Sequence, residues 1–247
     1  MPILLNCDLG ESYGSWRMGL DEAVMPYLDQ ANVACGFHGG DPVTIEKTLA
    51  LAGAHDVAIG AHPSYPDLVG FGRRSMALSG DELRTTLHYQ IAALDGMAAI
   101  AGLSLDYVKP HGALYNDMMA NRDVRDTVMD AIQRYPKPLR LMLQATPEAD
   151  EYREEARRHD LDLWLEAFAD RCYDDDGRLL SRRKAGAVHP RERMLDQVRE
   201  LATAGSVTTV SGKKLHLSVD TLCVHGDNDE GVQAIREIRD LLADAAE

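Results

Sequence analysis

Short apolar runs alternate along the chain with longer segments in which apolar residues recur at helical spacing. We predict strands at these runs, because they are too short for helices and mostly lack polar alternation, as is typical of parallel strands covered on both faces. The predicted strands are residues 3–7, 32–35, 57–61, 105–108, 139–143, 161–168 and 222–224.

Several helix starts between these runs are marked by capping residues. Asp41 precedes Pro42, an N-cap followed by proline at the first helical position, and Thr146-Pro147 repeats the arrangement. Ser79 and Glu82 form a capping box that predicts a long helix to about residue 101. Residues 191–204 and 231–245 also have a helical period.

The alternation of strands and helices predicts an α/β fold, a (β/α) barrel that is distorted or seven-stranded. An open, doubly wound sheet is the alternative. Over residues 207–219 the pattern changes, and Ser211-Gly212 separates two short β-like runs that predict a hairpin. Since no repeat, low-complexity tract or linker interrupts the chain, we expect residues 1–247 to form one domain.

Composition narrows the range of partners. Asp and Glu outnumber Lys and Arg by 40 to 26, which gives a formal net charge of −14. Such a surface repels a phosphate backbone, so we expect no nucleic-acid partner, although a locally basic cleft can still bind a small anion.

The chain carries no signature of export or of membrane insertion. No apolar run approaches ~18 residues, and the amino terminus lacks a basic region and an apolar signal segment. The four cysteines form no CxxC pair, and Cys7, Cys35 and Cys223 lie in strand-like runs, which favours buried thiols over disulfides. We therefore expect a cytoplasmic protein with no membrane contact.

Four histidines lie at or just after the ends of predicted strands, in glycine-bracketed phrases. They are His38, His62, His111 and His225. Because a parallel α/β fold gathers the carboxyl ends of its strands around one site, we expect these side chains to converge as ligands or proton carriers. A single such histidine is more often a hydrogen-bonding residue without a catalytic role.

Two carboxylates, Asp8 and Glu11, follow the first strand three residues apart. Such a pair can ligate a hard metal, or divide into a base and an orienting partner. The alternative is that Asp8 caps a turn and Glu11 is solvated.

The loop after the third strand carries Ser64, Tyr65, Arg73 and Arg74 between prolines and glycines. A stiff loop of this kind is suited to a small polar substrate or a phosphate, for which arginine offers a bidentate fork. Surface ion pairs are an equally good explanation of the two arginines.

Cationic and polar groups follow the fourth and last predicted strands. Lys109 can stabilise a developing oxyanion or phosphoryl group, and His111 can exchange a proton. Further candidate binding residues are Tyr115, Asn116, His225 and Asp227. The chain has no GxxxxGK[ST] phosphate loop, GxGxxG, GxSxG or HExxH motif, so any use of ATP requires another arrangement or another subunit.

Six phrases, in this order, resemble the LamB/YcsF family and span nearly the whole chain. They are LNCDLGESYG from Leu5, ANVACGFHGGDP from Ala31, GAHPSYPDLVGFGRR from Gly60, VKPHGALYN from Val108, EAFADRCY from Glu166 and DTLCVHGD from Asp220. The resemblance implies a (β/α) barrel related to the glycoside hydrolase and deacetylase barrels. It also implies ATP-dependent opening of 5-oxoproline to glutamate, together with subunits B and C of a 5-oxoprolinase.

The resemblance centres the expected site on six residues and leaves two other functions open. They are Asp8, Glu11, His38 and His62, with Lys109 and His111 opposite. By analogy with related barrels, Asp8, His38 and His62 are the expected ligands of a divalent metal such as magnesium. The other functions are a metal-dependent carbohydrate deacetylase, which the low aromatic content of 6% disfavours, and a non-catalytic substrate-binding subunit.

Overall fold

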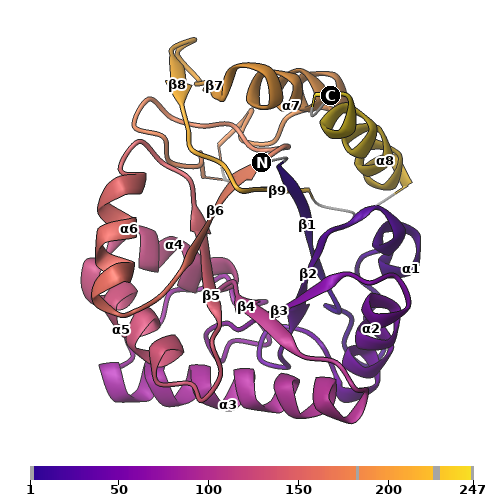
Figure 1. The fold of residues 1–247 in the computed structure, drawn as a ribbon, viewed down its shortest axis with the longest axis vertical. Coiled ribbons are helices and arrows are strands. Elements are labelled where there is room, and N and C mark those ends of the chain that lie inside the picture. The colour runs from indigo at the N-terminus through magenta and orange to yellow at the C-terminus, as the bar shows by residue number, and fades with distance from the viewer. Residues whose placement is uncertain (1–2, 182–183, 225–228, 246–247) are drawn as a thin grey trace.

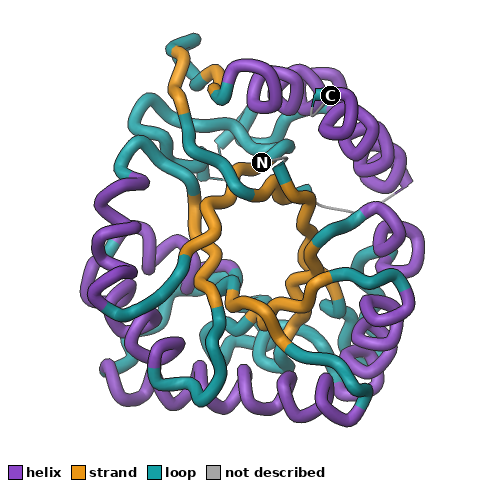
Figure 2. The backbone as a smooth tube through the Cα atoms, viewed as in Figure 1, coloured by secondary structure: helices purple, strands orange, loops and turns teal. Residues whose placement is uncertain are grey.

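Seven parallel strands close into a barrel in the computed structural model, which describes residues 3–181, 184–224 and 229–245 (Figures 1 and 2). Around the barrel, the strands follow the order β1 (Leu4–Leu9), β2 (Gln30–Ala34), β3 (Ala58–His62), β4 (Leu105–Val108), β5 (Arg140–Gln144), β6 (Leu163–Phe168) and β9 (Thr221–Cys223). These strands match the seven predicted runs to within a few residues, so the barrel prediction is confirmed.

Closure depends on the last strand. Strand β9 pairs in parallel with β1 on one side and with β6 on the other. Thr221 is the common partner, aligned with Leu4 in β1 and with Glu166 in β6. Since every barrel strand has two neighbours, the open-sheet alternative is wrong.

Helices surround the barrel and cover the outer faces of its strands (Figure 1). They are α1 (Asp21–Val24), the 3₁₀ turn η1 (Met25–Tyr27), α2 (Pro42–Ala54), α3 (Gly80–Ile100), α4 (Gly112–Ala120), α5 (Arg122–Gln133), α6 (Ala149–Arg158), α7 (Arg191–Ala204) and α8 (Asp229–Asp244). Among the described residues, no helix is long and apolar enough to cross a membrane.

Helix starts follow the capping chemistry at two of the three predicted sites. The Asp41 carboxylate accepts hydrogen bonds from the backbone amides of Val43 and Thr44, and Ser79 forms a complete capping box with Glu82. The third prediction was wrong by two residues. The Thr146 hydroxyl instead accepts from the amide of Glu148, in the turn before α6 begins.

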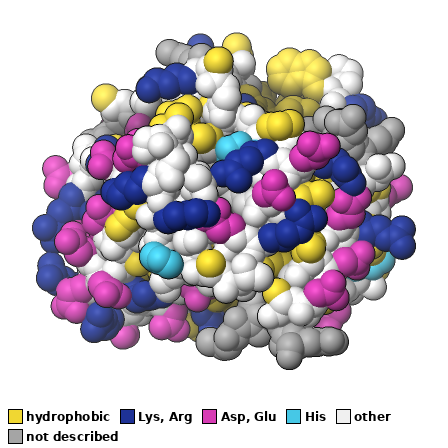
Figure 3. All heavy atoms as spheres, turned by 90° about the horizontal axis from the view of Figure 1, so that it is seen from above, with side chains coloured by type: hydrophobic (Ala, Val, Ile, Leu, Met, Phe, Trp, Pro, Cys, Tyr) yellow, Lys and Arg dark blue, Asp and Glu magenta, His cyan; other side chains and the backbone are white. Residues whose placement is uncertain are grey.

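The remaining strands form the predicted hairpin outside the barrel. Strand β7 (Ser206–Thr208) pairs antiparallel with β8 (Lys214–His216). Gly212 in the connecting turn has a φ of +89°, a conformation that favours glycine. All four cysteines are buried and unpaired, as predicted. On the face that Figure 3 shows, basic and acidic side chains are interspersed, so the acidic excess does not gather there.

A half-buried ion pair joins two outer helices. The Arg125 guanidinium in α5 donates to both carboxylate oxygens of Glu155 in α6, at 2.6 and 3.2 Å. It also donates to the carbonyl of Met118. These hydrogen bonds lower the pKa of Glu155 below its usual value.

We expect Glu155→Gln to lower the free energy of unfolding by about 1.5–3 kcal/mol at pH 7. Because the folded-state pKa is depressed, this contribution is complete above the unfolded pKa of about 4.3 and is lost as pH falls through the lower folded value. Urea denaturation from pH 7 to pH 3 measures the effect, with the exposed Glu46→Gln as control. A stability difference that stays constant with pH would contradict this account.

Candidate active site

Charged and polar side chains from strands far apart in the sequence meet at the carboxyl end of the barrel. Asp8 comes from β1, His62 ends β3, Lys109 directly follows β4, and Glu166 lies near the end of β6. A cavity of about 690 Å³ opens above them and is lined in part by Asp8, His62 and Lys109. This volume suits a small molecule.

The cation of Lys109 is held between two carboxylates at the base of this cavity. Its Nζ lies 2.6 Å from Glu166 Oε1 and 2.9 Å from Asp8 Oδ1, and its side chain is 3% exposed. Burial alone would lower the pKa of Lys109, but the two carboxylates raise it well above its usual value. Lys109 is therefore a fixed positive charge and not a base.

Both carboxylates are oriented by further hydrogen bonds. The Tyr115 hydroxyl donates to Glu166 Oε2 at 2.9 Å. The Asn32 amide donates to Asp8 Oδ1 at 2.9 Å and to Asn6 Oδ1 at 2.8 Å. A polar layer inside the barrel thus supports the ionic cluster, which limits the cost of burying its charges.

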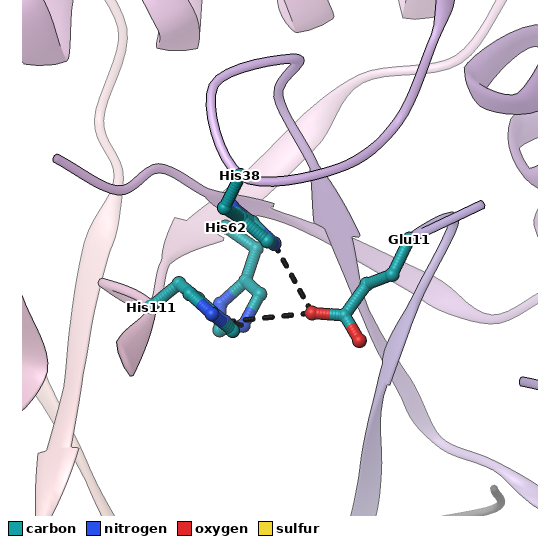
Figure 4. A group of neighbouring side chains, drawn as sticks. All are labelled: Glu11, His38, His62 and His111. Carbon is teal, nitrogen blue, oxygen red and sulfur yellow. Dashed lines mark hydrogen bonds and ion pairs between the residues drawn. The ribbon is translucent and has the colours of Figure 1, made fainter. Parts of the chain in front are cut away.

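Three histidines lie together beside this cluster (Figure 4). The rings of His38 and His111 stack in parallel with centroids 3.7 Å apart, and His62 meets both of them edge-on. Glu11 Oε1 lies 3.1 Å from His38 Nε2 and 3.4 Å from His111 Nδ1. One ligand atom from each of these four residues lies within 4.8 Å of all the others.

The loop after β3 packs against the histidines. Phe71 contacts His38 and His111 edge-on, and its backbone has a φ of +53°, an uncommon conformation for a bulky residue. Gly72 follows with a φ of +62°, and a Cβ there would lie 2.9 Å from both His38 and His111. Burial and the neighbouring imidazoles lower the pKa values of His38 and His111 well below the usual range, so both rings are neutral at pH 7.

Arginines line another part of the cavity. Arg73, Arg171 and Arg178 all contribute to its wall. Arg171 is largely buried, and its guanidinium donates to the carbonyls of Leu180 and Ala187. On a chain of net charge −14, this local positive charge provides the basic cleft for a small anion.

Most of the predicted site residues converge. Those that line the cavity are Asp8, His62, Arg73, Lys109, His111, Tyr115 and Asn116, and Glu11 and His38 lie beside it. His225 and Asp227 lie outside the described residues.

Three predicted binding residues have other contacts and are not among the residues that line the cavity. The Ser64 hydroxyl donates to the carbonyl of Tyr65, whose own hydroxyl donates to Asp117. Arg74 pairs with Asp67, which matches the surface-ion-pair explanation considered for it.

Sequence reasoning gave no site role to Glu166, Phe71 or Arg171. The available signal for Glu166 was a carboxylate inside an otherwise apolar strand, because such a group is fully buried only when it is paired. Phe71 acts through its backbone conformation and its carbonyl, and nothing in the residue type marks that role.

The LamB/YcsF family model matches residues 3–247. The chain belongs to this family. It is 55% identical to 5-oxoprolinase A subunit 2 of Pseudomonas putida, over 97% of this chain and 93% of that protein. It is 53% identical to the 5-oxoprolinase A subunit of Pseudomonas fluorescens, over 97% of this chain and 96% of that protein.

A solved structure agrees over the same length. The lactam utilization protein of Thermus thermophilus superposes with a TM-score of 0.90 at 39% identity, covering 100% of this chain and 98% of that one. The barrel and its helices are therefore shared by this LamB/YcsF chain and that protein.

We expect Lys109→Met to lower the free energy of unfolding by about 3–5 kcal/mol, because it leaves Asp8 and Glu166 as uncompensated buried charges. Adding Glu166→Gln removes one of these charges, so the double variant should be more stable than Lys109→Met alone. Chemical denaturation of the single and double variants measures this coupling. Simple additivity of the two substitutions would show that the ion pair is not coupled as described.

Proposed function

We propose that this chain is the A subunit of an ATP-dependent 5-oxoprolinase, which opens the lactam of 5-oxoproline to glutamate. The observation that carries the proposal is the fixed cation of Lys109 at the base of a small-molecule cavity, in a chain about half identical to proteins named as A subunits of 5-oxoprolinase. The likeness to a lactam utilization protein supports the same substrate class.

The reaction requires help at the amide oxygen. A five-membered lactam is an unreactive amide, and transfer of a phosphoryl group from ATP to its oxygen activates the ring carbon. Water then adds its oxygen to that carbon, the ring C–N bond breaks, the nitrogen takes up protons, and phosphate leaves with the former amide oxygen. Lys109 is suited to stabilise the negative charge at this oxygen, because its protonation does not depend on the reaction.

Activation of water falls to the carboxylate that faces the cavity. Asp8 lines the cavity, and its Oδ2 lies 3.3 Å from His62 Nε2. We assign the role of general base to Asp8, with His62 as its partner in proton transfer. The neutral rings of His38 and His111 belong to the adjoining histidine cluster.

The arginines supply the remaining recognition. A substrate with a carboxylate, and a phosphoryl group in transfer, both match the bidentate geometry of guanidinium. Arg73 and Arg171 are placed to bind these anions at the cavity wall. Because the sequence has no phosphate loop, subunits B and C are the proposed source of much of the nucleotide site.

The reaction class is tested by glutamate release from 5-oxoproline. The chain alone, and the chain mixed with its candidate subunits B and C, are assayed with and without ATP. We expect ATP-dependent release only in the mixture. Absence of release from folded, associated subunits would remove the proposed function.

We expect Asp8→Asn to lower the turnover of the assembled complex by at least ~100-fold, the scale of a lost acid–base group, with assembly unchanged. Asp106→Asn is the matched control, since Asp106 is an exposed aspartate of β4 outside the site. Size-exclusion chromatography checks assembly. Near-normal turnover of the Asp8 variant in an intact complex would instead favour a non-catalytic binding subunit.

A further inference from the structure

Backbone carbonyls fix the protonation pattern of two histidines in the cluster. His62 Nδ1 lies 2.7 Å from the carbonyl oxygen of Lys109, and His111 Nε2 lies 2.9 Å from the carbonyl oxygen of Phe71. A carbonyl oxygen only accepts hydrogen bonds, so His62 Nδ1 and His111 Nε2 must each carry a hydrogen. In the neutral rings, the lone pairs therefore lie on His62 Nε2 and His111 Nδ1.

These two lone-pair nitrogens face each other at 2.9 Å. Two acceptors at this distance repel unless a positive centre lies beside both of them. A shared proton would relieve this one pair alone. The cluster contains more than the pair, because Glu11 Oε1 and a nitrogen of His38 turn toward the same point (Figure 4).

The separations between these atoms match those around a bound metal ion. Neighbouring contacts are 2.9 Å between His62 and His111, 3.1 Å between His38 and Glu11, and 3.4 Å between His111 and Glu11. Donors about 2.0–2.2 Å from one ion, in tetrahedral or octahedral arrangement, lie about 3.0–3.5 Å apart. Only small side-chain shifts would be needed to surround an ion.

We propose that Glu11, His38, His62 and His111 bind one divalent transition-metal ion through three imidazole nitrogens and one carboxylate oxygen. This donor set favours zinc, iron, cobalt or nickel over magnesium, which prefers oxygen ligands. It also differs from the set of Asp8, His38 and His62 expected by analogy. Asp8 instead lies beside the ion site, with its Oδ1 occupied by Lys109.

The surroundings of the cluster match those of metal-binding histidines. Such residues donate their second ring N–H to a carbonyl or carboxylate, which fixes the ring and its tautomer. His62 and His111 both do so here. The uncommon backbone conformation of Phe71 accompanies the carbonyl that orients His111, so the local strain has a role in holding a ligand.

Metal binding is tested on the full chain without a histidine tag, after treatment with a chelator and gel filtration. Cobalt(II) is titrated in and followed by its visible absorption, and zinc is then added in competition. We expect saturation at one equivalent per chain and displacement of cobalt by zinc. An excess of magnesium should leave the cobalt spectrum unchanged.

Variants locate the ion. His62→Ala and Glu11→Gln should each weaken cobalt binding by at least ~100-fold, because each removes one ligand. His55→Ala, at an exposed histidine outside the cluster, should bind like the unaltered chain. Circular dichroism confirms that each variant is folded, and Glu11→Gln, which keeps the size of the side chain, gives a second test if His62→Ala is not.

Absence of saturable cobalt or zinc binding to the unaltered chain would overturn the proposal. Equal affinity in the Glu11→Gln variant and the unaltered chain would overturn it as well. Since binding is measured without 5-oxoproline, ATP or partner subunits, these results stand apart from the success or failure of the proposed function.

Discussion

The positive charge of Lys109, held between the carboxylates of Asp8 and Glu166, is the interaction on which the rest of the site depends. Its three members follow or lie on β4, β1 and β6, which are not neighbours in the sheet. Only a closed barrel brings these strand ends within 3 Å of a common cation. Because separating the charges would leave buried, uncompensated ions, the cluster fixes the relative positions of three strands and of the catalytic groups that they carry.

Lys109 also connects the two halves of the site. Its ammonium holds the two carboxylates, while its backbone carbonyl accepts a hydrogen bond from His62 and so sets the tautomer of that ring. Asp8 lies between the halves, in contact with Lys109 through one oxygen and with His62 through the other. A change in charge on one side is therefore felt by the acid–base groups on the other.

The barrel could be predicted from sequence because its signals are local. Buried parallel strands appear as short apolar runs, and the capping groups of Asp41 and Ser79 mark their helices directly. The same reasoning placed Asp8, His62 and Lys109 together, because strand ends converge in such folds. It could not identify the role of Phe71, which depends on a backbone angle. Nor could it tell that Tyr65 and Arg74 engage Asp117 and Asp67, since those partners become neighbours only through the loop fold.

The most direct test of this account is a crystal structure of the chain with 5-oxoproline bound, in its complex with subunits B and C. We predict that the lactam oxygen lies within hydrogen-bonding distance of Lys109 Nζ, with the ring carbon facing Asp8 and the substrate carboxylate toward the arginines of the cavity wall. A lactam bound away from the carboxyl end of this barrel, with Lys109 contacting only Asp8 and Glu166, would contradict the account.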